Sequence, residues 1–202
     1  GTSHKSQIIT ISNPSPFPVQ SHIQEKTKTV LAIGRLTEQK GFDLLLEAWI
    51  QVSKVMPDWK LKIVGEGIER ADLNEFITLN QLDKCVELVG STDNISKYYQ
   101  QAEIFCLSSR YEGFGMVLIE ALAFGLPAVS FDCDAGPAEI LDGTGSILVP
   151  EKDTNELALS LIELMKDDEQ RKTISLRSKE KAKIYQPEKI TSQWIDILES
   201  FE

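Results

Sequence analysis

The sequence predicts an α/β fold built on a parallel sheet, and three observations lead to this prediction. Short apolar runs, typical of buried strands, alternate with longer segments whose apolar residues recur at helical spacing. Glycine follows the strand-like runs repeatedly, as at Gly34, Gly65 and Gly90. Strands and helices in regular succession form right-handed βαβ units, and such units build a parallel sheet.

The elements are expected in the following order. Residues 7–11 have the pattern of a strand, and the proline-containing residues 12–18 that of a stiff, extended connector, followed by loop up to residue 28. The remaining strands are expected at 30–33, 60–64, 86–89, 104–107, 128–131 and 146–149, and the helices at 42–56, 69–80, 94–101, before Gly125, from Gly136, and from 153 to the end with a break at Pro187.

Composition narrows the class of protein. The chain has 202 residues, and its 21 basic and 31 acidic side chains give a net charge of −10. Binding to nucleic acid requires clustered basic charge, so we expect no nucleic-acid partner. A small anionic ligand remains compatible, because a few local cations and N–H groups outweigh a distant acidic surface.

Cysteine and histidine usage indicates neither disulfides nor a metal site. Three cysteines, an odd number, are widely spaced, and we expect buried thiols. His4 and His22 lack the spacing of metal ligands, and no metal is expected. No apolar run approaches ~18 residues, which favours a cytoplasmic location. The chain begins without methionine, so we expect a piece of a longer protein.

The stretch 108–127 is the strongest candidate for a ligand site. Between the strand and the helix it carries Glu112, Gly113, Phe114 and Gly115. Glycines let backbone approach a ligand closely, and the N–H groups at a helix N-terminus favour phosphate. Carboxylates accept hydrogen bonds from hydroxyls. A ligand that is half phosphate and half polyol, such as a nucleotide sugar, fits this combination.

Glu120 lies eight residues beyond Glu112, among apolar neighbours on the expected helix. A partly buried carboxylate needs a partner, and either ribose hydroxyls or a cation would serve.

Other candidates also follow strands. Arg35 and Lys40 flank the loop after the first core strand, where Arg grips phosphate bidentately and Lys supplies a point charge. Two solvated surface cations are the alternative, but the carboxyl edge of a parallel sheet is where such folds bind ligands. The Gly65-Glu66-Gly67 turn lacks the third glycine of a dinucleotide fingerprint, so a plain tight turn explains it equally well.

The combined motifs resemble the C-terminal, donor-binding domain of retaining glycosyltransferases of the GT-B fold, family 4, the glycosyl transferases group 1. The resemblance extends from residue 13 to the last helix. It implies a Rossmann-like, three-layer α/β/α domain that forms one half of a GT-B enzyme. It rests on Gly34-Arg35-Leu36-x3-Lys40-Gly41, Gly65-x-Gly67, Val86-Glu87-Leu88-Val89-Gly90, Glu112-Gly113-Phe114-Gly115 with Glu120, and Gly125-Leu126-Pro127.

The resemblance also implies a role for each matched residue. Arg35 and Lys40 would hold the diphosphate and stabilise the leaving group, and Glu112 would address the donor sugar; these three form the expected catalytic set. Glu120 would take the ribose hydroxyls. The expected substrate-binding set is Gly34, Gly65, Gly90, Ser91, Gly113, Phe114, Gly115, Met116, Val117 and Glu120, with the Gly90–Ser91 turn near the base and 115–117 near the phosphates. Ala135 departs from the glycine common in the family before Gly136.

The expected organisation and function follow. Residues 1–28 would be a linker or exit strand from a missing N-terminal acceptor domain, and 29–202 the nucleotide-sugar donor-binding domain with C-terminal helices. The full protein would move a hexose from a nucleoside-diphosphate sugar, with UDP-hexose as the expected donor, to a saccharide or lipid-linked acceptor in surface polysaccharide or glycolipid synthesis. The isolated domain would bind donor without transferring sugar. No cofactor is expected, and any membrane association would come through the missing domain.

Two alternatives remain open: a nucleotide-sugar epimerase of GT-B fold, which would require further acid/base groups, and a non-catalytic nucleotide-binding module. A nicotinamide oxidoreductase is disfavoured by the incomplete glycine fingerprint.

Overall fold

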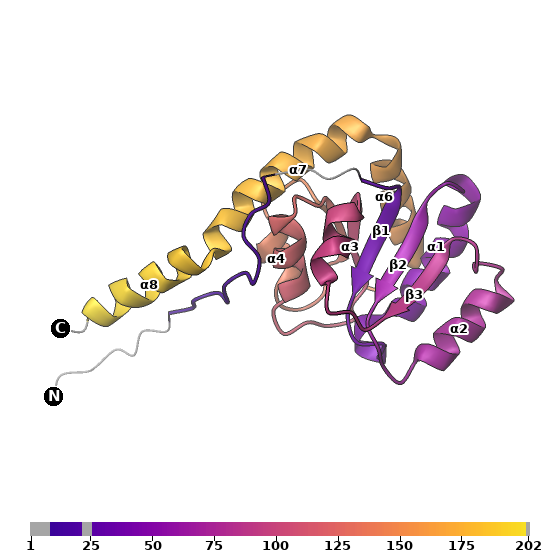
Figure 1. Cartoon of the computed structure of the whole chain (residues 1–202), viewed down its shortest axis with the longest axis horizontal. Helices are drawn as coiled ribbons and strands as arrows, with labels where there is room; N and C mark the ends of the chain where they lie inside the picture. Colours follow the sequence, from indigo (N-terminus) through magenta and orange to yellow (C-terminus); the bar gives the residue numbers. More distant parts are fainter. Residues whose placement is uncertain (1–8, 22–25, 201–202) are drawn as a thin grey trace.

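A computed structural model describes residues 9–21 and 26–200, and its centre is one parallel sheet of six strands in the order β3-β2-β1-β4-β5-β6. Figure 1 labels β1, β2 and β3 of this sheet. The apolar runs predicted this sheet, since strands buried on both faces lack polar alternation. The strands are β1 (Thr29–Ile33), β2 (Lys60–Val64), β3 (Val86–Gly90), β4 (Ile104–Leu107), β5 (Ala128–Phe131) and β6 (Ile147–Val149).

Helices connect these strands and close the chain. They are α1 (Phe42–Val55), α2 (Arg70–Leu79), α3 (Ile95–Gln101), α4 (Met116–Ala123), α5 (Pro137–Leu141), α6 (Thr154–Lys166), α7 (Asp168–Ala182) and α8 (Pro187–Glu199), with 3-10 turns η1 (Glu38–Lys40) and η2 (Lys183–Tyr185). The turn η1 lies where the sequence predicted only a loop.

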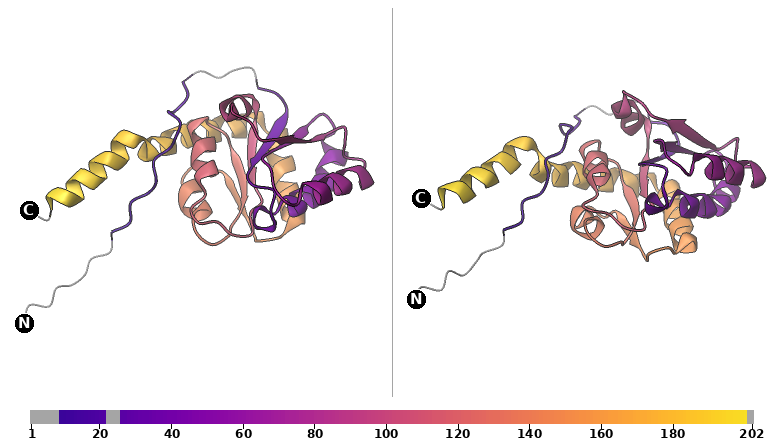
Figure 2. Two further views of the ribbon diagram at one scale, coloured as in Figure 1. Left: turned by 60° about the horizontal axis from the view of Figure 1, so that its bottom comes forward. Right: turned by 90° about the horizontal axis from the view of Figure 1, so that it is seen from below.

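The sheet separates two hydrophobic cores, which makes the domain three-layered (Figure 2). Alternate residues of β1 face opposite ways: Val30 joins the core under α1, α2 and α6, and Leu31 joins the core under α3, α4 and α5. Both residues are fully buried. The expected α/β/α fold class is thereby confirmed.

The N-terminal segment packs on the domain as extended chain. The backbone N–H of Ser15 donates to the Tyr185 carbonyl at 2.6 Å, and that of Gln20 to the Ala123 carbonyl at 2.8 Å. The Phe17 ring lies edge-on to the Phe124 ring at 5.2 Å. The predicted strand at 7–11 is wrong for residues 9–11, which pair with no strand; residues 7 and 8 lie outside the described part. A domain boundary at residue 28 stays a prediction.

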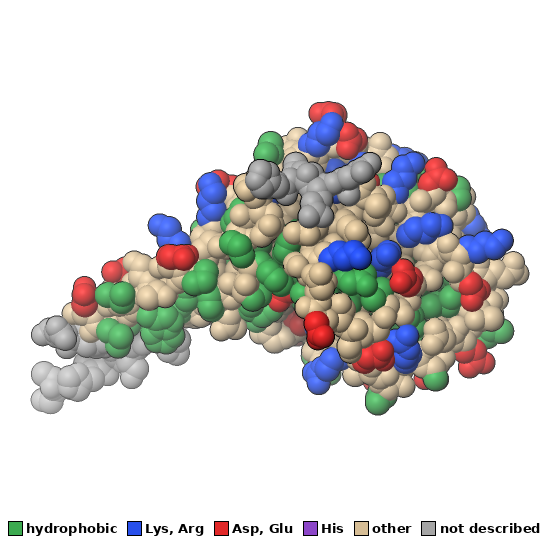
Figure 3. All heavy atoms as spheres, viewed as in Figure 1, with side chains coloured by type: hydrophobic (Ala, Val, Ile, Leu, Met, Phe, Trp, Pro, Cys, Tyr) green, Lys and Arg blue, Asp and Glu red, His purple; other side chains and the backbone are tan. Residues whose placement is uncertain are grey.

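Helix α8 extends away from the rest of the domain (Figure 1). Ile190 is buried near its start, whereas Trp194 and Leu198 are exposed, and Figure 3 shows hydrophobic side chains along this helix. Across residues 9–21 and 26–200, the structure contains no helix long and apolar enough for a membrane span.

The cysteines carry free thiols, as expected. Cys106 and Cys133 are buried and Cys85 is half-buried. Burial raises the pKa of Cys133 to about 11 and that of Cys106 further, which keeps both thiols protonated and unreactive.

Candidate functional site

The strand order reverses between β1 and β4, and this position determines where a ligand can bind. β2 and β3 lie on one side of β1, while β5 and β6 lie beyond β4. The loops that leave β1 and β4 therefore diverge, and open α/β sheets bind ligands in the crevice between such loops. Arg35 follows β1, and Glu112 lies in the loop after β4.

Lys40 and Glu112 form an ion pair between these two loops. The Lys40 ammonium lies 2.7 Å from a Glu112 carboxylate oxygen, and the two side chains are 15% and 7% exposed. The same carboxylate oxygen accepts a hydrogen bond from the Ser109 hydroxyl at 2.6 Å. Lys40 is therefore not the solvated surface cation that was the alternative from the sequence. Arg35 differs, because its side chain is exposed.

A second contact clamps the same two loops. The Arg110 guanidinium donates to both carboxylate oxygens of Asp43 at 2.8 and 2.6 Å, and to the Glu38 carbonyl at 2.7 Å. Burial alone would raise the pKa of Asp43, but hydrogen bonds and charge from Arg110 outweigh it and hold the pKa below its usual value. The turn η1, which carries Lys40, is thus fixed to the loop after β4. Sequence reasoning missed this clamp, because residues 67 positions apart leave no spacing signal.

Two glycines permit the close packing of the loops. Gly41 has φ +61°, and a Cβ there would overlap the Ser108 carbonyl. Gly65 has φ +147°, and a Cβ there would overlap the Gly34 carbonyl. Gly41 and Gly65 therefore bring backbone against backbone, which supports the tight-turn interpretation of the Gly65-Glu66-Gly67 segment.

A cleft of about 450 Å³ opens at the ends of β1, β2 and β3. It brings together four of the predicted residues, Gly34, Arg35, Gly65 and Ser91. Gly90 ends β3 beside it with φ +88°. The other residues that line the cleft are Ile33, Val64, Glu66, Thr92 and Ile95.

Helix α4 and the loop before it carry the remaining residues of the predicted substrate-binding set. It begins at Met116 directly after Gly115, so the N–H groups of Met116 and Val117 lie at the helix N-terminus without intrahelical partners, whereas that of Leu118 donates to the Gly115 carbonyl at 2.9 Å. Val117 lies in this first turn, and Gly113 and Phe114 precede it in the loop. A Cβ on Gly113 would meet no atom within 4 Å, so this glycine lies in open space.

Glu120 has a partner that the sequence did not suggest. The Tyr99 hydroxyl, from α3, donates to Glu120 Oε2 at 2.8 Å. Burial raises the pKa of Glu120, and this hydrogen bond offsets part of the rise. The Tyr99 ring is held by stacking on Phe124 at 5.0 Å. Glu120 is half-buried and pairs with a phenol rather than with a cation, so its expected need for a partner is met within the protein.

The described residues contain no group of three or more His, Cys, Asp or Glu placed to hold a metal ion. His4 and His22 lie outside the described part of the chain.

The structure belongs to the class of open, doubly wound α/β domains, which bind ligands at the switch point, the position where the strand order reverses. Here the Lys40–Glu112 ion pair lies at that position. The sequence profile of the family described as Glycosyl transferases group 1 matches residues 16–181. The chain therefore belongs to the glycosyl transferases group 1 family. The family and the fold class expected from the sequence, a C-terminal donor-binding domain of the GT-B type, are confirmed.

Named relatives fall in the same family. The chain is 39% identical over 199 residues to the amylovoran biosynthesis glycosyltransferase AmsD of Erwinia amylovora, covering 95% of this chain and 56% of the relative. A solved structure of an S. aureus TarM mutant with fondaparinux, alpha-GlcNAc-glycerol and UDP is 27% identical with a TM-score of 0.85, covering 96% of this chain and 40% of that one. The pneumococcal O-GlcNAc transferase GtfA with UDP and GlcNAc is also 27% identical with a TM-score of 0.83, covering 98% and 41%. The chain thus spans about half the length of these relatives or less.

Proposed function

We propose that this chain is the donor-binding part of a retaining glycosyltransferase that transfers a hexose from a nucleoside-diphosphate sugar. The observation that carries the proposal is the buried Lys40–Glu112 pair at the switch point, with Arg35 exposed nearby on the same edge of the sheet. Cations at this edge suit a diphosphate, and carboxylates suit sugar and ribose hydroxyls. Two similar structures were solved with UDP, which supports UDP as the nucleotide.

The proposed roles follow from charge development during transfer. As the bond to the sugar breaks, negative charge grows on the leaving nucleoside diphosphate, and fixed cations lower the energy of that state. Arg35 and Lys40 supply the cations, and the free N–H groups at the start of α4 supply a further positive potential. Glu112 would accept from the hydroxyls of the donor sugar, and Glu120 from those of the ribose through its second oxygen.

The proposal names the acceptor by its chemical class. AmsD is named for amylovoran biosynthesis, and TarM was solved with alpha-GlcNAc-glycerol. We propose a saccharide or lipid-linked acceptor in surface polysaccharide or glycolipid synthesis, bound by a part of the full protein outside this chain. Closure of the two parts would exclude water and align the reactants.

Calorimetric titration of the domain with UDP, GDP and ADP, without added metal, tests the donor assignment. We expect saturable binding of UDP that is weakened about tenfold or more by Arg35→Ala and by Glu120→Ala. Lys54→Ala, an exposed cation in the last turn of α1, is the matched control and should leave binding unchanged. Binding of all three nucleotides with equal affinity, insensitive to both variants, would contradict the proposal.

Turnover by the full-length protein separates the alternatives. A transferase releases nucleoside diphosphate in proportion to glycosylated acceptor. An epimerase would convert one nucleotide sugar into another without acceptor, and a non-catalytic module would bind donor with no turnover.

A further inference from the structure

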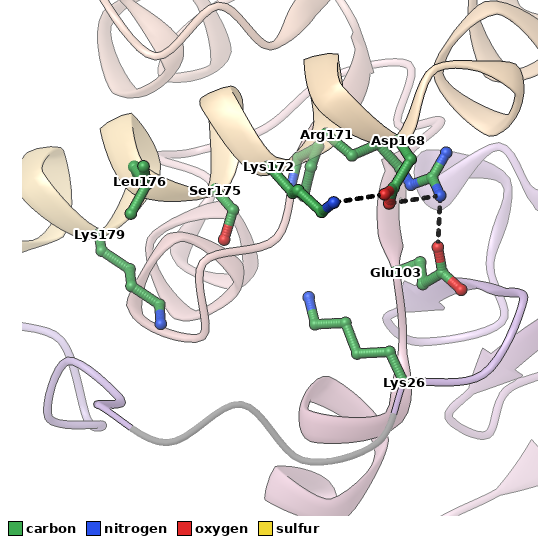
Figure 4. A pocket seen from close by; sticks show the side chains of 9 residues that line it. Lys26, Glu103, Asp168, Arg171, Lys172, Ser175, Leu176 and Lys179 are labelled. Atoms are coloured by element: carbon green, nitrogen blue, oxygen red, sulfur yellow. Dashed lines mark hydrogen bonds and ion pairs between the residues drawn. The ribbon is translucent and has the colours of Figure 1, made fainter.

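The cleft of about 450 Å³ at the ends of β1, β2 and β3 is the proposed donor cleft. A second cavity, of about 500 Å³, lies at the opposite edge of the sheet. Its wall includes Lys26, Glu103 and Pro127, which precede β1, β4 and β5, so it opens at the amino ends of the strands. Helix α7 forms the facing wall through Asp168, Arg171, Lys172, Ser175, Leu176 and Lys179 (Figure 4). Strands of about five residues place this cavity roughly 15 Å from the donor edge.

The lining is unbalanced in charge. Four cationic side chains, Lys26, Arg171, Lys172 and Lys179, face two carboxylates, Glu103 and Asp168. With all six ionised, the described residues that line the cavity carry an excess of two positive charges, in a protein whose net charge is −10.

The two carboxylates are committed to two of the cations. Arg171 lies 2.9 Å from Glu103, and both side chains are largely buried. Arg171 also donates to the Leu164 and Met165 carbonyls at 2.6 and 2.9 Å. Lys172 lies 2.7 Å from Asp168. These cations therefore build the wall of the cavity.

Lys26 and Lys179 remain, and neither forms an ion pair with any of the described residues 9–21 and 26–200. Burial lowers the pKa of Lys26 to about 8; Glu103 opposes this, and the positive charges of Lys179 and Arg171 add to it. The charged form of Lys26 is therefore disfavoured in this position, and an anion bound beside its ammonium would stabilise it.

The position of α7 over the cavity is set by backbone packing. A Cβ at Gly125 would lie 2.6 Å from Lys179 Cε and 2.8 Å from Ser175 Oγ, so both side chains rest on a bare stretch of main chain. Figure 4 shows the Lys26 ammonium directed toward α7 and the Ser175 hydroxyl directed into the space between. Two ammonium groups and a hydroxyl thus border one cavity that also has apolar lining from Pro127 and Leu176.

We propose that this cavity binds a phosphate monoester at a site separate from the donor cleft. A phosphate monoester carries close to two negative charges at neutral pH, since its second pKa is about 6, and this matches the excess of two positive charges. Its oxygens accept from Lys26, Lys179 and the Ser175 hydroxyl. The cavity is within the size range of small-molecule sites, and its apolar wall suits the body of an ester better than a bare ion. The proposal holds whether or not the proposed transferase function is correct.

Titration of the chain with inorganic phosphate and with glucose 6-phosphate, in the presence of saturating UDP, tests the site. Under the proposed function UDP fills the donor cleft, so that binding of the probes there does not contribute. If UDP does not bind, the loss of affinity in the lysine variants still reports on the second cavity alone. We expect saturable binding of both probes, tighter for the ester, and at least a fivefold loss of affinity in Lys26→Gln and in Lys179→Gln. The control is Lys183→Gln. Lys183 is an exposed lysine just after the end of α7 and is paired with Glu180, so this variant should bind like the wild type.

A direct reading of Lys26 keeps the test independent of variant folding. The wild-type chain labelled with carbon-13 at the lysine side chains should show the depressed pKa of Lys26 rising when glucose 6-phosphate binds. Absence of binding to either probe at 20 mM, affinity unchanged in both variants, or a Lys26 signal that does not respond to the ester would each overturn the proposal. Lys26→Arg should retain binding, because it keeps the charge.

Discussion

The Lys40 ammonium and the Glu112 carboxylate lie 2.7 Å apart although 72 residues separate them in the sequence. Each side chain alone would be a partly buried, uncompensated charge, and such charges are costly. Their pairing holds the loop after β1 against the loop after β4, at the point where the sheet order reverses. The pair therefore links the stability of the domain to the geometry of the candidate donor site.

Removal of the Glu112 charge should lower the stability of the domain. Glu112→Gln leaves the Lys40 ammonium without its counter-charge, and we expect a loss of about 2 kcal/mol in the free energy of unfolding. Urea unfolding measures this loss. Glu75→Gln, an exposed position on α2, should change stability by less than about 0.5 kcal/mol. Equal stability of Glu112→Gln and the control would show that the pair is dispensable.

The Arg110–Asp43 clamp should act as a unit. Arg110→Ala and Asp43→Ala each remove the bidentate contact, so the double variant should be hardly less stable than Arg110→Ala, which also loses the hydrogen bond to the Glu38 carbonyl. A double-mutant cycle by urea unfolding should give a coupling of about 1 kcal/mol or more. Arg110→Lys should recover only part of it, because an ammonium cannot replace the planar fork. Strict additivity of the two single variants would contradict the clamp.

Glu120 should make stability fall as pH rises. Burial raises its pKa in the folded state above its ordinary value of 4.5, so the folded protein holds this proton more tightly than the unfolded chain does. The resulting contribution is present below pH 4.5 and is lost as pH rises through the folded-state pKa. Glu120→Gln should therefore gain stability relative to the wild type between pH 4 and pH 7, while its affinity for UDP falls. Unfolding curves across this range measure the trend.

Asp43 provides a comparison of opposite sign. Its pKa is lowered in the folded state, so its contribution is present above its ordinary value of 3.8 and is lost as pH falls through the folded-state pKa. Asp43→Asn should lose stability relative to the wild type at pH 7 and less so toward pH 3. The same sign of pH dependence in Asp43→Asn and Glu120→Gln would contradict the assigned environments.

Ala135 occupies a backbone conformation that suits glycine. Its φ is +62°, in the left-handed region, which costs a residue with a Cβ about 1 kcal/mol. Ala135→Gly should therefore raise the free energy of unfolding by about 0.5 kcal/mol or more, after the entropy that glycine adds to the unfolded chain is subtracted. Asn or Asp at this position should have a smaller effect. A loss of stability in Ala135→Gly would show that the strain is offset elsewhere.

Much of the fold could be predicted from the sequence, and the limits have physical reasons. Continuous apolar runs such as 104–107 are typical of strands buried on both faces, and the glycines at 34 and 65 correctly placed the turns. The run at 7–11 is also rich in isoleucine, but residues 9–11 form no strand. The composition of a segment indicates whether its side chains prefer to be buried. Whether the segment pairs with another strand depends on neighbours in the folded structure, which the local sequence does not identify.

The site was harder to predict than the sheet. Arg35, Lys40 and Glu112 were identified from motif and position, and the structure brings the last two into contact. Tyr99 and Arg110 were missed, because their partners lie 21 and 67 residues away and no spacing rule connects them. Such tertiary hydrogen bonds become visible only when α3, α4 and the two loops are assembled.

The central claim is that the cleft at the carboxyl ends of the strands binds a nucleoside diphosphate. Amide nuclear magnetic resonance spectra of the domain, recorded during a titration with UDP, test it most directly. We predict saturable shift changes at Gly34, Arg35, Ser91 and residues 115–117, with little change along α7. Changes confined to α7 and the amino edge, or no saturable change at any of these residues, would contradict the claim.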